Sequence, residues 1–204
     1  MPKRKKRQPK PNAEYLIPQV TLKKSTVRLL ALDPGSRNMG ISCVAVNTEG
    51  RVKVIANSIV TNPVNDLTQF GPRRDAFLSE IDRWIDQFQP NGIIAERFQT
   101  RGIGGPLIEQ VSVMLGLLSG RYHTLPVKLI TAATWKNAFH RRFEHATLDE
   151  LYRESLTTPH QLDSCFIGLY GLEAGLGREL DYEPFDIMKQ AVDTSLVRLI
   201  NKRR

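Results

Sequence analysis

The chain has 204 residues, of which 41% are hydrophobic and 25% charged, with a formal net charge of +8 and a pI near 9.7. This length fits one domain with its own core, and the composition is that of an ordinary globular protein rather than a fibrous or disordered one. No uninterrupted apolar run is long enough to span a bilayer, and the N-terminal sequence lacks the apolar stretch of a secretory signal. We therefore expect neither a membrane protein nor a secreted one.

The two cysteines, Cys43 and Cys165, have no Cys or His near them at the spacing of zinc ligands. Isolated thiols of this kind are most often small core residues of proteins from a reducing compartment. We expect both side chains to be buried and the protein to work inside a cell.

The positive charge is concentrated in one segment. Residues 1–10 hold six Lys and Arg residues and no acid, so the other 194 residues carry a net charge of only +2. Such a run is typical of a nucleic-acid-binding arm, a nuclear localisation signal or a solubilising tail. Because Pro-rich, polar sequence continues to about Pro18, we predict a disordered basic arm over 1–18 and a folded domain over 19–204.

The hydrophobic pattern predicts an alternation of strands and helices. Short apolar runs predict strands at Val27–Leu32, Ile41–Val46, Val52–Val60, Ile93–Ala95 and Val127–Ile130. Apolar residues at helical spacing predict helices at about 73–88, 107–120, 135–140, 148–155, 160–174 and 186–200. Short turns join the first three strands, which indicates an antiparallel meander. The order predicts an α/β fold with a mixed five-stranded sheet and helices on both of its faces.

Two acidic residues follow predicted buried strands directly. Asp33 ends the first strand and Glu96 ends the fourth, at positions where an unpaired carboxylate would carry a desolvation cost. Each has a structural interpretation as well: Asp33 can cap the turn at Pro34-Gly35, and Glu96 can pair with Arg97. If the two strands are neighbours in the sheet, their ends bring both carboxylates together.

A third acid lies at the predicted start of a helix. Thr158, Pro159 and Gln161 match a capping box with proline in the first turn. This start places His160 and Asp163 three residues apart on one face of the first turn. A first-turn acid is also favoured by the helix dipole alone, and His160 can equally be a surface residue.

Three carboxylates that converge on one point suit phosphodiester hydrolysis by two metal ions. One ion generates the nucleophile from water and the other stabilises the departing oxygen. Hard ions such as Mg²⁺ take oxygen ligands, which carboxylates supply. We therefore predict Asp33, Glu96 and Asp163 as catalytic, metal-binding residues.

Three motifs together resemble the RuvC family of Holliday-junction resolvases, particularly its phage-type members, in the RNase H-like superfamily. The motifs lie within about residues 28–172 and comprise Leu32–Ile41 with its acid, Pro-Gly turn and following glycine, Ile94–Phe98 with the second acid, and His160–Cys165 running into Gly168–Gly171. Many cellular members carry two acids in the last motif. Here the earlier position is His160, which could bind a metal or position the attacking water.

The resemblance implies an RNase H-like homodimer whose two active sites cut opposing strands of a four-way DNA junction. It implies two Mg²⁺ ions per active site, with Mn²⁺ as a substitute, and adds His160 to the candidate catalytic and metal-binding set. It also implies a basic face that recognises branched DNA by shape, through backbone contacts. The candidate DNA contacts are Arg37, Arg97, Arg101, Lys136, Arg141 and Arg142.

Other functions fit parts of the pattern. The turn at Asp33–Ser36 is similar to the phosphate-binding hairpin of actin-like ATPases and sugar kinases, but those enzymes need two such domains. A non-catalytic DNA-binding module is disfavoured by the intact acids. The sequence does not distinguish a nuclease for flaps or other branched DNA in phage genome processing from one that cuts only four-way junctions. We expect a cytoplasmic location in a bacterial or phage-infected cell, and the basic arm is compatible with a nucleus.

Overall fold

A single sheet of five strands crosses the part of the chain that the computed structural model describes, residues 26–98 and 105–195. The strands are β1 (Val27–Pro34), β2 (Asn38–Val46), β3 (Val52–Thr61), β4 (Gly92–Arg97) and β5 (Val127–Thr131). They lie in the order β3-β2-β1-β4-β5, with β1, β2 and β3 antiparallel and β4 parallel to both β1 and β5. The predicted meander and mixed five-stranded sheet are confirmed.

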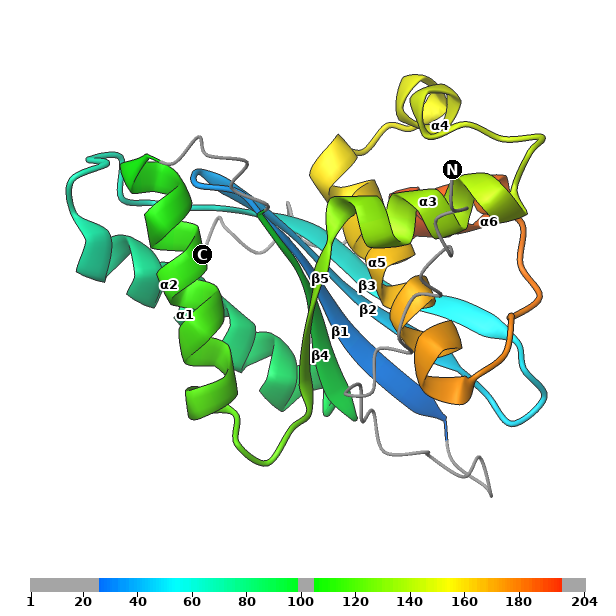
Figure 1. Ribbon diagram of the computed structural model, residues 1–204, viewed down its shortest axis with the longest axis horizontal. Helices are drawn as coiled ribbons and strands as arrows, with labels where there is room; N and C mark the ends of the chain where they lie inside the picture. The colour runs from blue at the N-terminus through cyan, green and yellow to red at the C-terminus, as the bar shows by residue number, and fades with distance from the viewer. Residues whose placement is uncertain (1–25, 99–104, 196–204) are drawn as a thin grey trace, which may run out of the picture.

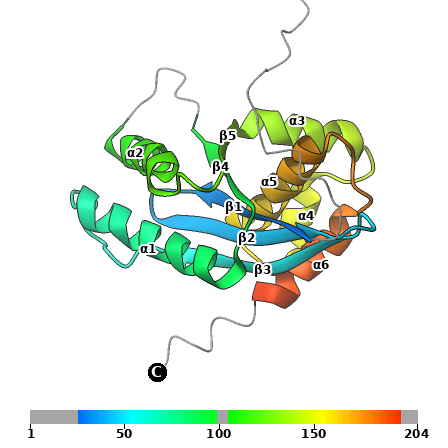
Figure 2. The same cartoon turned by 90° about the horizontal axis from the view of Figure 1, so that it is seen from below.

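Helices cover both faces of this sheet, as predicted. They are α1 (Phe70–Phe88), α2 (Pro106–Arg121), α3 (Ala132–Arg142), α4 (Leu148–Glu154), α5 (Pro159–Leu176) and α6 (Pro184–Ser195). Figure 1 shows α1 and α2 on one side of the sheet and α3 to α6 on the other, and Figure 2 shows the same layers from below. Within the described ranges, no helix is long and apolar enough to cross a membrane.

The side chains of β1 alternate between two hydrophobic cores. Leu29 and Ala31 pack beneath α5, whereas Leu30 and Leu32 belong to the core under α1 and α2. Successive residues of a strand point to opposite faces, so the alternation assigns Asp33 to the α5 face. The sheet therefore directs this acid toward the face that α5 covers.

The cysteines occupy the interior, as predicted. Cys43 lies in the core under α1 and α2, Cys165 belongs to α5 and lies in the core beneath it, and both are buried free thiols. Burial raises the pKa of each thiol to about 12, so neither side chain is a ready nucleophile.

Several elements are longer than the hydrophobic pattern predicted. Strand β1 continues two residues beyond the expected end, so Asp33 belongs to the strand and pairs with Gly40 of β2. Helix α1 begins at Phe70 and includes Pro72, because an amide in the first helical turn needs no acceptor within the helix. The predicted arm at 1–18, and residues 196–200 of the last predicted helix, lie outside the described residues.

Helix α5 packs unusually close to the sheet, and glycines permit the approach. A Cβ on Gly40 would lie 1.8 Å from the carbonyl oxygen of His160, and one on Gly168 would lie 2.5 Å from Val44 Cγ2. Both distances are below any tolerable contact, so only glycine fits with the helix in this position. The close approach fixes the first turn of α5 over the ends of β1 and β2.

The contact at Gly40 yields a stability prediction. Replacing Gly40 with alanine is expected to lower the free energy of unfolding by about 1–3 kcal/mol, because the new methyl group meets a main-chain carbonyl. Urea denaturation followed by circular dichroism measures the change.

The matched control is Gly116→Ala. Gly116 lies in α2 with nothing within 4 Å of the position that a Cβ would take. Alanine is the better helix former by about 1 kcal/mol, so this variant should be as stable as the parent or more stable. Equal stability of the two variants would contradict the proposed packing constraint.

Candidate active site

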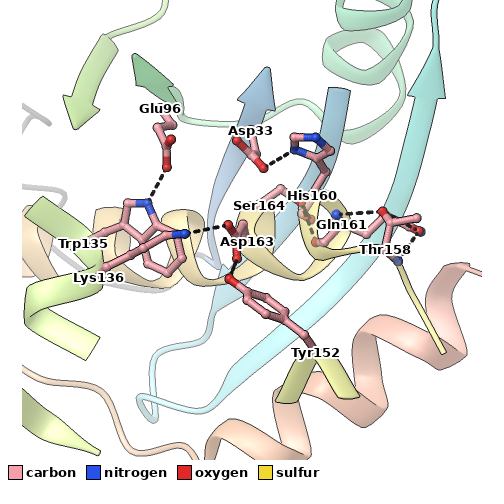
Figure 3. Close-up of polar contacts among 11 residues, drawn as sticks. Asp33, Glu96, Trp135, Lys136, Tyr152, Thr158, His160, Gln161, Asp163 and Ser164 are labelled. Atoms are coloured by element: carbon pink, nitrogen blue, oxygen red, sulfur yellow. Dashed lines mark hydrogen bonds and ion pairs between the residues drawn. The ribbon is translucent and has the colours of Figure 1, made fainter. Parts of the chain in front are cut away.

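Three elements bring the predicted acids to one region, at the end of the sheet where β1 and β4 finish. The parallel register pairs Leu32 with Ala95, so the next residues, Asp33 and Glu96, lie at adjacent strand ends. Asp163, the fifth residue of α5, faces the same region (Figure 3). Asp33 and Asp163 are only 6% and 7% exposed, so two carboxylates here have left bulk water.

Asp33 is bound by His160. The imidazole donates from Nδ1 to Asp33 Oδ2 over 2.6 Å, between residues 127 positions apart in the chain. This hydrogen bond raises the pKa of His160 above its usual value, against the opposing effect of partial burial. His160 is therefore part of the site and carries a positive charge more readily than a free histidine.

Glu96 is bound by an indole. Trp135 donates from Nε1 to Glu96 Oε2 over 2.7 Å, in place of the Arg97 pairing that the sequence also allowed. Burial is the main cause that raises the pKa of Glu96 to about 6, against the effect of the Trp135 hydrogen bond, and the charges of Asp33 and Asp163 contribute to the same shift. The acids thus lie close enough for the charges of Asp33 and Asp163 to disfavour ionisation of Glu96.

Asp163 has two partners from two further helices. The Tyr152 hydroxyl, on α4, donates to Asp163 Oδ1, and the Lys136 ammonium, on α3, lies 3.2 Å from Oδ2. Burial raises the pKa of Asp163, and the two donors work against that shift. The capping box predicted from Thr158 and Gln161 is formed, which fixes where this helix begins.

Two residues of this site were not assigned a role from the sequence. Trp135 is 39 residues from Glu96, and Tyr152 is 11 residues from Asp163. Lys136 was predicted as a DNA contact, and its neighbour Trp135 was given no role. Nothing in the local sequence around Tyr152 indicates that its hydroxyl faces an acid.

The donor set suits a hard divalent cation. Its oxygens are carboxylates, and the mutual effect of their charges on the pKa of Glu96 indicates a concentrated negative potential that a cation would relieve. Within the described ranges, no three His, Cys, Asp or Glu side chains form a ready-made metal cluster. Each acid is instead directed to its own donor, as Figure 3 shows.

The candidate DNA contacts divide into three groups. Arg37, Arg97 and Arg141 are exposed, and Lys136 reaches Asp163 with 36% of its side chain exposed. Arg101 lies outside the described residues. The remaining candidate, Arg142, has a different environment.

Arg142 is engaged inside the fold. Its guanidinium pairs with Glu173, donates to the carbonyl of Leu180 and lies over the rings of Phe143 and Tyr182. A cation held by so many internal partners is a structural residue of the α3–α5 packing. The guanidinium of Arg142 is therefore engaged within the protein, unlike the exposed arginines that were predicted with it.

Comparison with known proteins finds one relative by sequence and several similar structures. No family model matches the chain. The crossover junction endodeoxyribonuclease RuvC of Pseudarthrobacter chlorophenolicus is 34% identical over 73 residues, which cover 35% of this chain and 36% of that protein. The yeast mitochondrial Holliday junction resolvase Ydc2 has a similar structure, with a TM-score of 0.50 and 14% identity over 81% of this chain and 82% of the other. The fold is RNase H-like.

A further similar structure is T. thermophilus RuvC in complex with a Holliday junction substrate, with a TM-score of 0.47, 15% identity and coverage of 81% of this chain and 90% of the other. The fold class and the resemblance to RuvC that the three motifs indicated are confirmed. The sequence match spans only about a third of the relative's length, so activity, substrate and partners are matters for proposal.

The raised pKa of Glu96 yields a prediction on stability. The ionised form of Glu96 is disfavoured in the folded protein. The contribution of protonated Glu96 to stability is therefore full below about pH 4.5 and is lost as the pH rises through about 6. Glu96→Gln removes the charge and keeps an acceptor for Trp135. In metal-free buffer at pH 7.5 we expect this variant to be more stable than the parent by on the order of 1 kcal/mol, as measured by urea denaturation.

The control is Glu144→Gln at an exposed position, which should change stability little at any pH. The gain for Glu96→Gln should shrink as the buffer approaches pH 4.5. A gain that is independent of pH would argue against burial and neighbouring charge as its cause.

Proposed function

We propose that this protein is a metal-dependent endodeoxyribonuclease that resolves four-way DNA junctions. The observation that carries the proposal is the approach of three acids from β1, β4 and α5, with the charges of Asp33 and Asp163 raising the pKa of Glu96. The similarity to RuvC, a crossover junction endodeoxyribonuclease, supports the reaction class and the substrate.

Asp33, Glu96 and Asp163 would hold the metal, with two Mg²⁺ ions per site and Mn²⁺ as a substitute. When bound, such ions lower the pKa of a water nucleophile and neutralise the charge that develops on the leaving oxygen. His160 uses Nδ1 for Asp33, which leaves Nε2 for a metal or for the attacking water. Removal of the metal with a chelator should therefore stop cleavage.

Exposed basic residues would contact the DNA backbone. We assign this role to Arg37, Arg97, Arg141 and Lys136, because phosphate contacts supply affinity without base readout. Phe98, an aromatic side chain that is 42% exposed just beyond β4, is placed to stack against an unpaired base at a junction. A DNA contact by Arg101 or by the arm at residues 1–18 stays a prediction.

A homodimer completes the proposal, since one four-way junction needs two cuts on opposing strands. The cellular location, cytoplasmic or nuclear, stays a prediction.

The principal alternative keeps the chemistry and broadens the substrate to flaps and other branched DNA. A non-catalytic module is the other alternative, and both are outcomes of the experiment below.

The test is cleavage of synthetic four-way junctions, flaps and duplexes in Mg²⁺ or Mn²⁺. We expect junction cleavage, and a loss of at least about 100-fold in Asp33→Asn, Glu96→Gln and Asp163→Asn, because each removes a charged metal ligand. Junction binding, measured by electrophoretic mobility shift, should persist because the phosphate contacts remain. Deleting residues 1–18 should weaken binding at higher salt if the arm contacts DNA.

Asp186→Asn, an exposed acid of α6 that pairs with Lys189, is the matched control and should cleave normally. Near-normal cleavage by any of the three variants would remove that residue from the metal-binding set. Equal cleavage of flaps and junctions would favour the broader nuclease. Binding without cleavage by the parent protein would favour the non-catalytic module.

A further inference from the structure

One carboxylate oxygen of each acid in the site accepts a hydrogen bond from a side chain. Two of these donors carry no net charge, and the third is a histidine that forms an ion pair with its acid when it is protonated. Trp135 binds Glu96 Oε2, and Tyr152 binds Asp163 Oδ1. The third acid follows the same pattern, because His160 binds Asp33 Oδ2. The three donors come from three different helices, so the pattern is a property of the assembled fold.

The second carboxylate oxygen of each acid has different contacts from the first. Asp33 Oδ1 and Glu96 Oε1 have no hydrogen-bond partner in the described part of the chain. Among the described residues, Asp163 Oδ2 contacts only the ammonium of Lys136, on a long side chain that is 36% exposed. Each acid thus has one fixed oxygen and one oxygen that is open or held by a displaceable cation.

Tyr152 differs from Lys136 in what it can do for Asp163. A phenol is neutral near pH 7 and remains a donor beside a bound cation, whereas an ammonium repels one. Tyr152 is also firmly placed, because α4 begins with a complete capping box at Thr147 and its Leu151 is fully buried. A rigid neutral donor is suited to fixing the rotamer of a ligating carboxylate.

We infer that Tyr152 is a positioning residue, which holds Asp163 Oδ1 so that Oδ2 faces a divalent cation in place of the Lys136 ammonium. The inference rests on the proposed metal-dependent function and adds to it a determinant of metal affinity. Partners of metal-ligating carboxylates typically change metal affinity by about 10–100-fold when they are lost.

The chain contains a matched control for this contact. On the opposite face of the sheet, Tyr122 donates from its hydroxyl to Asp82 Oδ1 over 2.6 Å, and Arg121 binds the same carboxylate. This arrangement also joins a carboxylate to a tyrosine hydroxyl and a cationic side chain, with a guanidinium in place of the Lys136 ammonium, and it lies away from the acids of the site. Tyr122→Phe therefore removes an equivalent hydrogen bond without touching the proposed metal site.

The experiment compares Tyr152→Phe, Tyr122→Phe and the parent protein by calorimetric titration with MnCl₂ and by the Mn²⁺ dependence of junction cleavage. We expect Tyr152→Phe to weaken Mn²⁺ binding about 10-fold or more and to raise the half-activating Mn²⁺ concentration by a similar factor, with cleavage recovering at saturating metal. Tyr122→Phe should bind Mn²⁺ as the parent does. Thermal unfolding in EDTA reports any loss of stability separately.

Mn²⁺ binding by Tyr152→Phe within twofold of the parent would overturn the positioning role and leave the proposed function intact. Equal weakening in both tyrosine variants would also overturn it, because the effect would then be one of general stability. If the parent protein itself binds no Mn²⁺ and cleaves no junction, the proposed function fails and this inference fails with it.

Discussion

The contact between α5 and the sheet is the constraint on which the rest of the structure depends. The helix starts against Gly40 of β2 and continues against the sheet at Gly168, where no larger residue fits. Because the helix backbone packs closely at both places, His160 and Asp163 lie beside the strand ends. The same packing that stabilises the core therefore sets the geometry of the polar site.

Grouping three carboxylates at one end of a sheet is electrostatically unfavourable, and the fold offsets this with at least one hydrogen-bond donor for each acid. Trp135, Tyr152 and His160 each reach a different carboxylate. The pKa of Glu96 stays raised, first by burial and then by the charges of Asp33 and Asp163, so the donors do not fully compensate for the repulsion. Residual repulsion of this kind destabilises the folded protein slightly and favours a cation, which is the usual compromise of an active site.

The basic residues show why charge alone is a poor guide to a binding surface. Arg141 and Arg142 are neighbours in the sequence, and both were candidate DNA contacts. Arg141 is exposed, whereas the guanidinium of Arg142 pairs with Glu173 and lies over two aromatic rings. Only the direction of each side chain relative to α5 separates an available cation from an internal one.

The sequence by itself determined the strands, the helices, the capping box of α5 and the acids that end β1 and β4, because these follow from local hydrophobic period and local turn chemistry. The tertiary structure decided the partners of the acids. Trp135 and Tyr152 lie 39 and 11 residues from the carboxylates that they bind. Such pairs depend on how helices pack across a sheet, and no local pattern records that packing.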